Sequence, residues 1–250
     1  MLHFDDIVFG PISSRRLGSS LGVNILPSKG KLCNFDCVYC ECGWNQPVLH
    51  PQLPTREQVR KALASSLISQ SSDNPIDVIT FSGNGEPTMH PDFPEIIEAT
   101  IRCRDRFFPN AKVSVLSNAT LIGRKAVADA LRRVDNPILK IDASDDDMIG
   151  LINKPSGQYR LKGVIDDLRS FEGNFILQTM FLRSPDFNTV DPEALAGWMD
   201  IVRETRPREI MVYTIDRETP DKSLQKYTVE EMTAFVKPLL DEGFKIQVRG

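Results

Sequence analysis

Three cysteines stand within a short segment, Cys33-Asn-Phe-Asp-Cys37-Val-Tyr-Cys40. A closed structural zinc site takes four protein ligands, and an electron-transfer iron–sulfur cluster takes four thiolates. Three thiolates on one loop instead predict a cluster with one iron left open to a ligand that is not protein. Tyr39, between the second and third cysteine, is suited to cover a face of that ligand.

Other interpretations of the cysteines remain open at this point. Cys42 can be the fourth ligand of a zinc knuckle, although the gap in Cys40-Glu-Cys42 is not the usual spacing of paired zinc ligands. The thiols can also be unrelated and buried. Cys42 can be an acceptor or radical relay, but packing is the commoner role of such a cysteine. Cys103 is on a predicted helix face, where we expect it to be buried.

Composition narrows the class of protein. The chain has 250 residues, 41% hydrophobic and 26% charged, as expected for one globular α/β domain. It has no apolar run long enough for a membrane span, and its first residues lack the pattern of a signal peptide. Five cysteines, three of them clustered, favour metal or redox use in a reducing compartment, so a cytoplasmic location is expected. The net charge of −4 does not indicate nucleic acid as a partner.

From Leu21 onward the chain repeats a short apolar run, a polar loop and a helical pattern. Near-continuous apolar runs are typical of parallel strands covered on both faces. The runs are 21–26, 76–81, 113–116, 138–141, 175–181, 210–215 and 244–248.

The predicted helices lie between these runs. Capping boxes are expected at Thr55 with Gln58 and at Thr228 with Glu231, and Pro238 should kink the last helix. The alternation predicts a parallel sheet with right-handed crossovers, an α/β fold in the form of a partial (βα)6 TIM-like barrel. Residues 1–20 read as an irregular N-terminal segment or lid before a domain spanning 21–250.

Ligands of parallel α/β sheets bind at the carboxyl ends of the strands, and polar residues collect there. The glycine loop at 82–88 lets the backbone approach a ligand closely. Other strand-end groups are equally compatible with helix caps, ordinary strand polarity or solvated charge. These groups are Ser117, Asn118, Lys140, Asp142, Gln178 and Arg217, together with the pair Arg15 and Arg16 near the N-terminus.

The CxxxCxxC spacing with an aromatic before the last cysteine resembles the radical S-adenosylmethionine (SAM) enzymes. Gly85-Glu86-Pro87 resembles their GGEP-type loop, with Asn84 interrupting the usual paired glycines. The segments 9–18 and 82–90 are similar to a subgroup of small, stand-alone iron–sulfur oxidoreductases loosely related to wybutosine-synthesis enzymes. That grouping does not define a substrate.

The resemblance implies that Cys33, Cys37 and Cys40 ligate a [4Fe–4S] cluster whose fourth iron is chelated by SAM. One electron would then cleave SAM to methionine and a 5′-deoxyadenosyl radical, which abstracts hydrogen from a small molecule, a nucleotide base or a peptide. A donor such as flavodoxin or ferredoxin would supply the electron. Expected SAM contacts are Tyr39, Gly83, Asn84, Gly85, Glu86, Ser117, Asn118, Asp142 and Gln178; substrate candidates are Arg15, Arg16, Lys140 and Arg217.

Two alternative functions remain. An activase that installs a glycyl radical on a partner protein has the same cysteine spacing, but that family usually has a glycine before the first cysteine, where this chain has Lys31-Leu32. A zinc-containing RNA-binding module would need no catalysis. In the enzyme interpretation, the N-terminal segment, the loop after the sixth strand or a partner closes the substrate side.

Overall fold

The computed structural model describes residues 4–14, 17–46, 51–70 and 76–250. Its central sheet has the strand order β1-β2-β3-β4-β5-β6-β8-β10. All neighbours from β2 to β10 are parallel, and β1 is antiparallel to β2. The strands are β1 (Val8–Ser14), β2 (Gly18–Val23), β3 (Val78–Phe81), β4 (Lys112–Ser117), β5 (Asn136–Lys140), β6 (Ile176–Met180), β8 (Glu209–Tyr213) and β10 (Ile246–Arg249).

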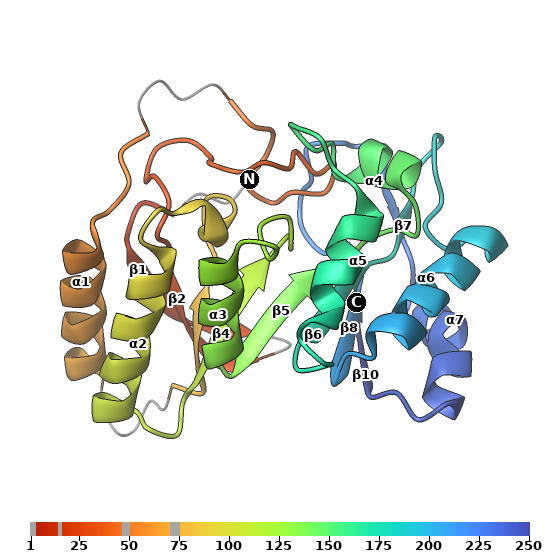
Figure 1. The fold of residues 1–250 in the computed structure, drawn as a ribbon. Coiled ribbons are helices and arrows are strands. Elements are labelled where there is room, and N and C mark those ends of the chain that lie inside the picture. Colours follow the sequence, from red (N-terminus) through yellow and green to blue (C-terminus); the bar gives the residue numbers. More distant parts are fainter. Residues whose placement is uncertain (1–3, 15–16, 47–50, 71–75) are drawn as a thin grey trace.

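Helices cover the outer face of this sheet, and α1, α2 and α3 lie in a row against it (Figure 1). The helices are α1 (Arg56–Ser69), α2 (Phe93–Phe107), α3 (Lys125–Arg133), α4 (Asp146–Ile152), α5 (Leu161–Arg169), α6 (Pro192–Thr205) and α7 (Val229–Asp241). The curled, mostly parallel sheet confirms the predicted partial barrel. None of the helices in the described ranges has the length and apolar character needed to cross a membrane.

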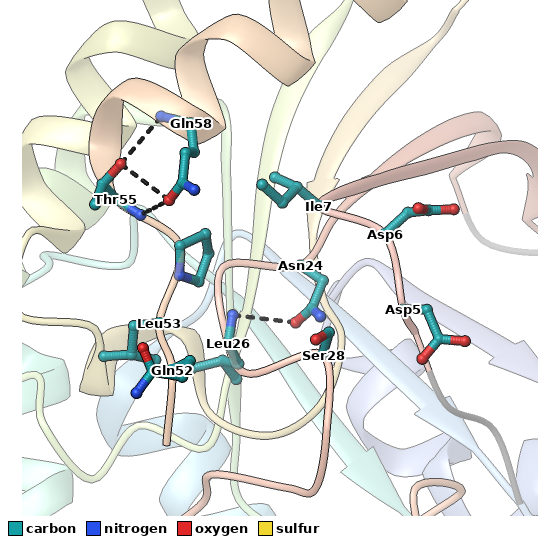
Figure 2. A pocket seen from close by; sticks show the side chains of 11 residues that line it. Asp5, Asp6, Ile7, Asn24, Leu26, Ser28, Gln52, Leu53, Thr55 and Gln58 are labelled. Carbon is teal, nitrogen blue, oxygen red and sulfur yellow. Dashed lines mark hydrogen bonds between the residues drawn. The ribbon is translucent and has the colours of Figure 1, made fainter. Parts of the chain in front are cut away.

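The predicted helix starts at Thr55 and Thr228 are confirmed. Both residues form complete capping boxes, and Figure 2 shows the one that joins Thr55 to Gln58. Pro238 lies inside α7, which continues to Asp241.

The expectation that residues 1–20 are irregular is wrong for residues 8–14. They form the edge strand β1, and its register shifts between Phe9 and Ile12. An edge strand with a bulge tolerates proline, which explains how Gly10-Pro11 fits within it. The expected boundary at residue 20 falls inside β2, so the hairpin belongs to the main sheet.

The strand expected at 21–26 is shifted toward the N-terminus, because β2 begins at Gly18 and ends at Val23. The Asn24 side chain accepts a hydrogen bond from Leu26 N at 3.1 Å, a local turn that competes with strand pairing. Ile25 and Leu26 are nevertheless buried. The apolar pattern therefore predicted burial correctly but not the bounds of the strand.

Three elements near the carboxyl edge of the sheet were not predicted. The short helix α4 begins after Asp145, whose side chain accepts from Met148 N at 2.7 Å. The strands β7 (Leu182–Arg183) and β9 (Gln225–Lys226) pair antiparallel and join the loops after β6 and β8. A small apolar cluster, including Val38, Tyr39 and Ile152, packs at this edge apart from the main core.

Candidate active site at the mouth of the barrel

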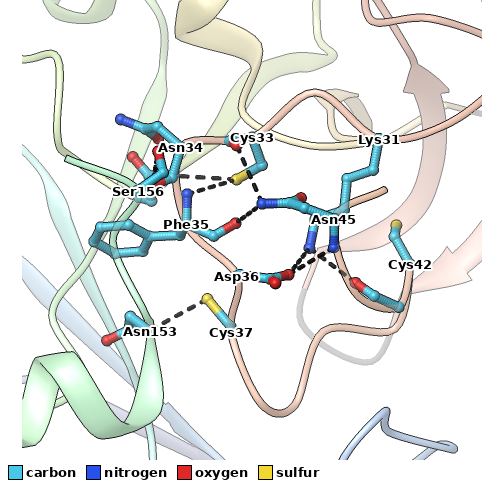
Figure 3. Close-up of polar contacts among 12 residues, drawn as sticks. Lys31, Cys33, Asn34, Phe35, Asp36, Cys37, Cys42, Asn45, Asn153 and Ser156 are labelled. Carbon is cyan, nitrogen blue, oxygen red and sulfur yellow. Dashed lines mark hydrogen bonds and ion pairs between the residues drawn. The ribbon is translucent and has the colours of Figure 1, made fainter. Parts of the chain in front are cut away.

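The cysteine loop leaves β2 and crosses the carboxyl edge of the sheet, coloured orange in Figure 1. Asn45 closes the loop: its Nδ2 donates to the carbonyls of Cys33 (3.3 Å) and Phe35 (3.0 Å), and its backbone N donates to Asp36 Oδ1 (2.7 Å) (Figure 3). Cys33, Cys37 and Cys40 are half-buried on this loop, and none forms a disulfide. The fold thus presents all three thiols from one braced segment.

The glycine loop after β3 holds one side of the cysteine loop. Leu32 N donates to Asn84 O at 2.9 Å, and Glu86 N donates back to Leu32 O at 2.9 Å. A Cβ atom added at Gly85 would lie 1.9 Å from Leu32 O, and Gly85 has a φ of +133°. Only glycine allows this approach, so Gly85 is required for packing of the cysteine loop.

The end of α4 holds the other side. Asp36 N donates to Asn153 O at 2.8 Å, and Val38 N donates to Ile152 O at 2.9 Å. The Asn153 side chain turns inward and donates to Cys37 Sγ at 3.3 Å (Figure 3). The cysteine loop is therefore clamped between two segments that come from different crossovers.

The donor set suits an iron–sulfur cluster. Besides Asn153, Phe35 N donates to Cys33 Sγ at 3.4 Å, and hydrogen bonds of this kind to sulfur tune such clusters. Lys31, only 8% exposed, adds a positive charge beside the thiols.

The pKa shifts of the thiols differ because their surroundings differ. Burial raises the pKa of Cys33, and raises that of Cys37 to about 11. A hydrogen bond from the Cys42 thiol, together with the Lys31 charge, lowers the pKa of Cys40 to about 6. Burial lowers the pKa of Lys31, but the charges of Cys40 and Cys33 more than offset this, so its ammonium form is stabilised. A positive group thus favours the thiolates that metal ligation requires.

Glu86 is buried at the junction of the glycine loop and the end of β4. Its carboxylate accepts hydrogen bonds from Ser117 Oγ at 2.9 Å, Asn118 N at 2.6 Å and Thr88 N at 3.0 Å. Burial raises the pKa of this carboxyl. These contacts tie the ends of β3 and β4 together.

Asn118 and Asn84, predicted as SAM contacts, have side chains occupied by protein partners. Asn118 Nδ2 donates to Asn34 Oδ1 at 2.8 Å, beside Cys33. Asn84 is fully buried, and its side chain bonds the backbone of Phe4 and Pro27 at 2.8–3.0 Å. Both asparagine side chains brace the loops, so contact between the Asn84 side chain and SAM is not supported.

A second buried network surrounds Asp142, at the end of β5. Its carboxylate accepts from the Tyr39 hydroxyl, from Asn153 Nδ2 at 2.8 Å and from Met180 N at 2.9 Å. The Lys140 ammonium lies 3.7 Å from the same carboxylate. Asp142 therefore orients Tyr39 and Lys140 rather than presenting an unbonded oxygen to a ligand.

Tyr39 and Lys140 line a cavity of about 250 Å³ next to Cys40, and we name it the inner cavity. Lys140 Nζ bonds the Tyr213 hydroxyl and lies 4.7 Å from the centre of the Tyr39 ring. Burial lowers the pKa of Lys140, but Asp142 and Tyr213 raise it more, so the ammonium stays protonated. Gln178 also lines the inner cavity; it is 4% exposed, and its Nε2 has no hydrogen-bond partner among the described residues.

The unpartnered Gln178 amide is unusual, because buried donors are otherwise bonded. The inner cavity thus brings together five of the predicted residues, Tyr39, Cys40, Lys140, Gln178 and Arg217. A cavity of about 430 Å³ lies elsewhere, between residues 5–7, the turn after β2 and the start of α1 (Figure 2), and its lining includes none of the three cysteines.

The arginine candidates and the two other cysteines complete the set of predicted residues. Arg15 and Arg16 lie outside the described residues. Arg217, on the loop after β8, pairs with Glu41 on the cysteine loop at 2.6 Å. Cys42 donates from its thiol to Gly83 O at 3.4 Å. Cys103 is half-buried on α2, so the expectation of full burial is wrong.

A family model described as "Radical SAM superfamily" matches residues 28–182, which include the cysteine loop, the glycine loop and both buried networks. The chain belongs to the radical SAM superfamily. It is 30% identical over 223 residues to a UPF0026 protein of Helicobacter pylori, covering 87% of this chain and 68% of that protein.

Solved radical SAM structures share the fold at low sequence identity. SuiB of Streptococcus suis bound to S-adenosylmethionine has a TM-score of 0.67 at 16% identity, covering 92% of this chain and 50% of SuiB. A radical SAM methyltransferase of Sphaerobacter thermophilus has a TM-score of 0.68 at 16% identity, covering 92% of this chain and 65% of the methyltransferase. The chain thus spans about half the length of SuiB.

As a radical SAM protein the chain is an enzyme whose cofactors are a [4Fe–4S] cluster and SAM, and it needs an external electron donor. Sequence reasoning missed three residues near these cofactors. Asn153 follows an unpredicted helix, Glu41 pairs with a residue far along the chain, and Lys31 directly precedes Leu32 and Cys33. Of the three, only Lys31 had a recognisable sequence signal, because a cation next to three cysteines stabilises their thiolates.

Proposed function

We propose that Cys33, Cys37 and Cys40 hold the cluster and that SAM lies between the open iron and the inner cavity. When bound, cluster and SAM supply, on one-electron reduction, a 5′-deoxyadenosyl radical that abstracts hydrogen from a substrate. The observation that carries this proposal is that Cys40, Tyr39, Lys140 and Gln178 line one cavity. A cluster ligand and an unpartnered donor then meet at one cavity.

The chain's own residues bind SAM, orient it and shield it. Tyr39 is fixed by the bond of its hydroxyl to Asp142, so its ring forms a rigid wall of the inner cavity. Lys140 is held by Asp142 and Tyr213 and supplies a fixed positive charge suited to a carboxylate, such as that of SAM. Gln178 supplies a neutral donor for a hydroxyl or ring nitrogen.

The loop braces have a separate role. Gly85 and Glu86 hold the glycine loop against Leu32 and the end of β4, and Gly83 contributes backbone to the same surface. Ser117 and Asn118 keep Glu86 in place. In this proposal the backbone of residues 83–86 receives the amino group of SAM, while the side chains around it maintain the shape of the loop.

The electron donor is proposed to be a small redox protein such as flavodoxin or ferredoxin, and a reducing cytoplasmic location suits an open iron. The experiment is anaerobic reconstitution followed by iron and sulfide analysis and by reduction in the presence of SAM. We expect about four irons and four sulfides per chain, and methionine and 5′-deoxyadenosine in equal amounts. Loaded, reduced protein that leaves SAM intact would contradict the proposal.

A further inference from the structure

A second cavity, of about 350 Å³, adjoins the inner cavity, and we name it the outer cavity. The two cavities share Glu41, Leu116 and Arg217 in their linings. Glu41 comes from the cysteine loop and Arg217 from the loop after β8, and their ion pair of 2.6 Å stands where the cavities meet. The barrel mouth is thus divided into two compartments by one pair of side chains.

The outer cavity has a mixed wall. Its apolar part includes Phe4 and Phe9, whose rings stack at 4.1 Å. Hydroxyl groups also line this cavity. They belong to Ser13, Ser14, Ser20, Thr80 and Ser82.

Charge in the outer cavity is confined to the dividing pair. Among its described lining residues, Glu41 and Arg217 are the charged ones. Their side chains are 39% and 54% exposed, and ion pairs in such positions are weak because water screens them. A ligand can therefore replace one partner at small cost.

We propose that the outer cavity binds the substrate, and that the substrate carries a carboxylate or phosphate group that replaces Glu41 on Arg217. This inference rests on the proposed function, because it places the substrate beside the SAM compartment. The planar guanidinium fork matches two oxygens of such a group, and neighbouring hydroxyls donate to the others. The substrate's apolar part then lies against Phe9 and Leu116, next to the inner cavity.

Exchange of Glu41 for a substrate anion has a distinctive signature. Removing Arg217 removes the anchor, whereas removing the charge of Glu41 removes a competitor. The two variants must therefore change anion affinity in opposite directions. A purely structural role of the ion pair would instead make both variants lose affinity together.

The test is calorimetric titration of phenyl phosphate into cluster-loaded protein with saturating SAM, under anaerobic conditions. We expect saturable binding that Arg217→Ala weakens at least ten-fold, that Arg217→Lys weakens less, and that Glu41→Gln tightens several-fold. Arg169→Ala, which removes an exposed arginine paired with Glu204 at 3.6 Å on the outer helices, is the matched control and should bind like the wild type.

Three results would overturn the inference: no saturable binding of phenyl phosphate, equal affinity of Arg217→Ala and wild type, or weaker binding by Glu41→Gln. Binding of benzylamine that depends on Glu41 would also overturn it, since it would reverse the charge of the ligand. Iron content and SAM cleavage, measured on the same preparations, report on the proposed function separately. Protein that holds the cluster and cleaves SAM but does not bind phenyl phosphate would contradict the proposed anion site and leave the proposed function standing.

Discussion

The two cavities at the barrel mouth are built in different ways. Beside the inner cavity, most buried polar side chains are bonded to one another: Asp142 alone holds Tyr39, Asn153 and Met180 N, and the Gln178 amide is the exception. The Glu41–Arg217 pair that divides the two cavities is exposed, and on the outer side the Ser82 hydroxyl has no partner among the described residues. Hydrogen bonds within the protein thus fix the shape of the inner, cofactor cavity, whereas the outer, substrate cavity keeps groups that a ligand can bond.

The same contrast holds for the segments that form the walls. The cysteine loop is clamped by backbone hydrogen bonds to the glycine loop on one side and to the end of α4 on the other. The loop after β8 reaches the cysteine loop through the bond from Asp221 N to Val38 O, at 3.2 Å, and through the Arg217–Glu41 pair. Substitutions around the inner cavity should therefore lower activity and stability more than substitutions around the outer cavity.

The largest effect is expected for the cluster ligands. Cys37→Ala should lose the cluster and reduce SAM cleavage to background, because three thiolates are the minimum for this site. Iron and sulfide analysis after reconstitution, with 5′-deoxyadenosine formation, measures both. Cys42→Ala is the control and should keep about four irons per chain. A Cys37→Ala protein with full iron content would show that the ligand assignment is wrong.

A smaller loss is expected for Asn153→Ala. Its Nδ2 donates to Cys37 Sγ at 3.3 Å and to Asp142 at 2.8 Å, and loss of such supporting bonds typically costs about 10–100-fold in metal affinity or activity. The rate of iron loss to a chelator and the rate of SAM cleavage test this. Asn174→Ala, on the exposed turn before β6, serves as control. Equal rates of iron loss from the two variants would show that the Asn153 side chain does not support the cluster.

Gly85→Ala is expected to destabilise the fold by about 2 kcal/mol, because the added Cβ would meet Leu32 O at 1.9 Å. For a chain of this size that lowers the Tm by about 4–8 °C. Gly157→Ala is the matched control, since a Cβ there meets nothing within 4 Å. Thermal denaturation of the loaded proteins makes the comparison, and similar Tm values would refute the packing role of Gly85.

The smallest effect on stability is expected on the substrate side. Arg217→Ala breaks an exposed ion pair worth under about 1 kcal/mol, so its Tm should fall by less than about 3 °C. The change should shrink further in high salt. A fall in Tm as large as that of Gly85→Ala would remove the contrast between the two compartments.

Sequence patterns predicted where the cysteine loop and the glycine loop lie because both signals are local. The cysteine spacing and the glycine loop each lie in one short segment, and the apolar runs placed both at strand ends. Asn153 was missed because it acts across more than a hundred positions, at 3.3 Å from Cys37 Sγ. The Glu41–Arg217 pair was missed for the same reason, since only the closed barrel brings the two loops together.

One wrong expectation has a local physical cause. Gly10-Pro11 reads as a turn, yet the register shift of β1 accommodates it at a sheet edge. The ligand contacts expected of Asn84 and Asp142, from their place at strand ends, remain predictions. In this chain their polar atoms are bonded to the protein, which only three-dimensional packing reveals.

The central claim is that SAM binds the iron that no cysteine ligates. Its most direct test is electron–nuclear double resonance on the reduced, cluster-loaded protein with SAM carrying nitrogen-15 in its amino group. We expect a nitrogen-15 coupling to the cluster that disappears when unlabelled SAM replaces the labelled compound. A reduced, SAM-saturated cluster with no such coupling would contradict the account.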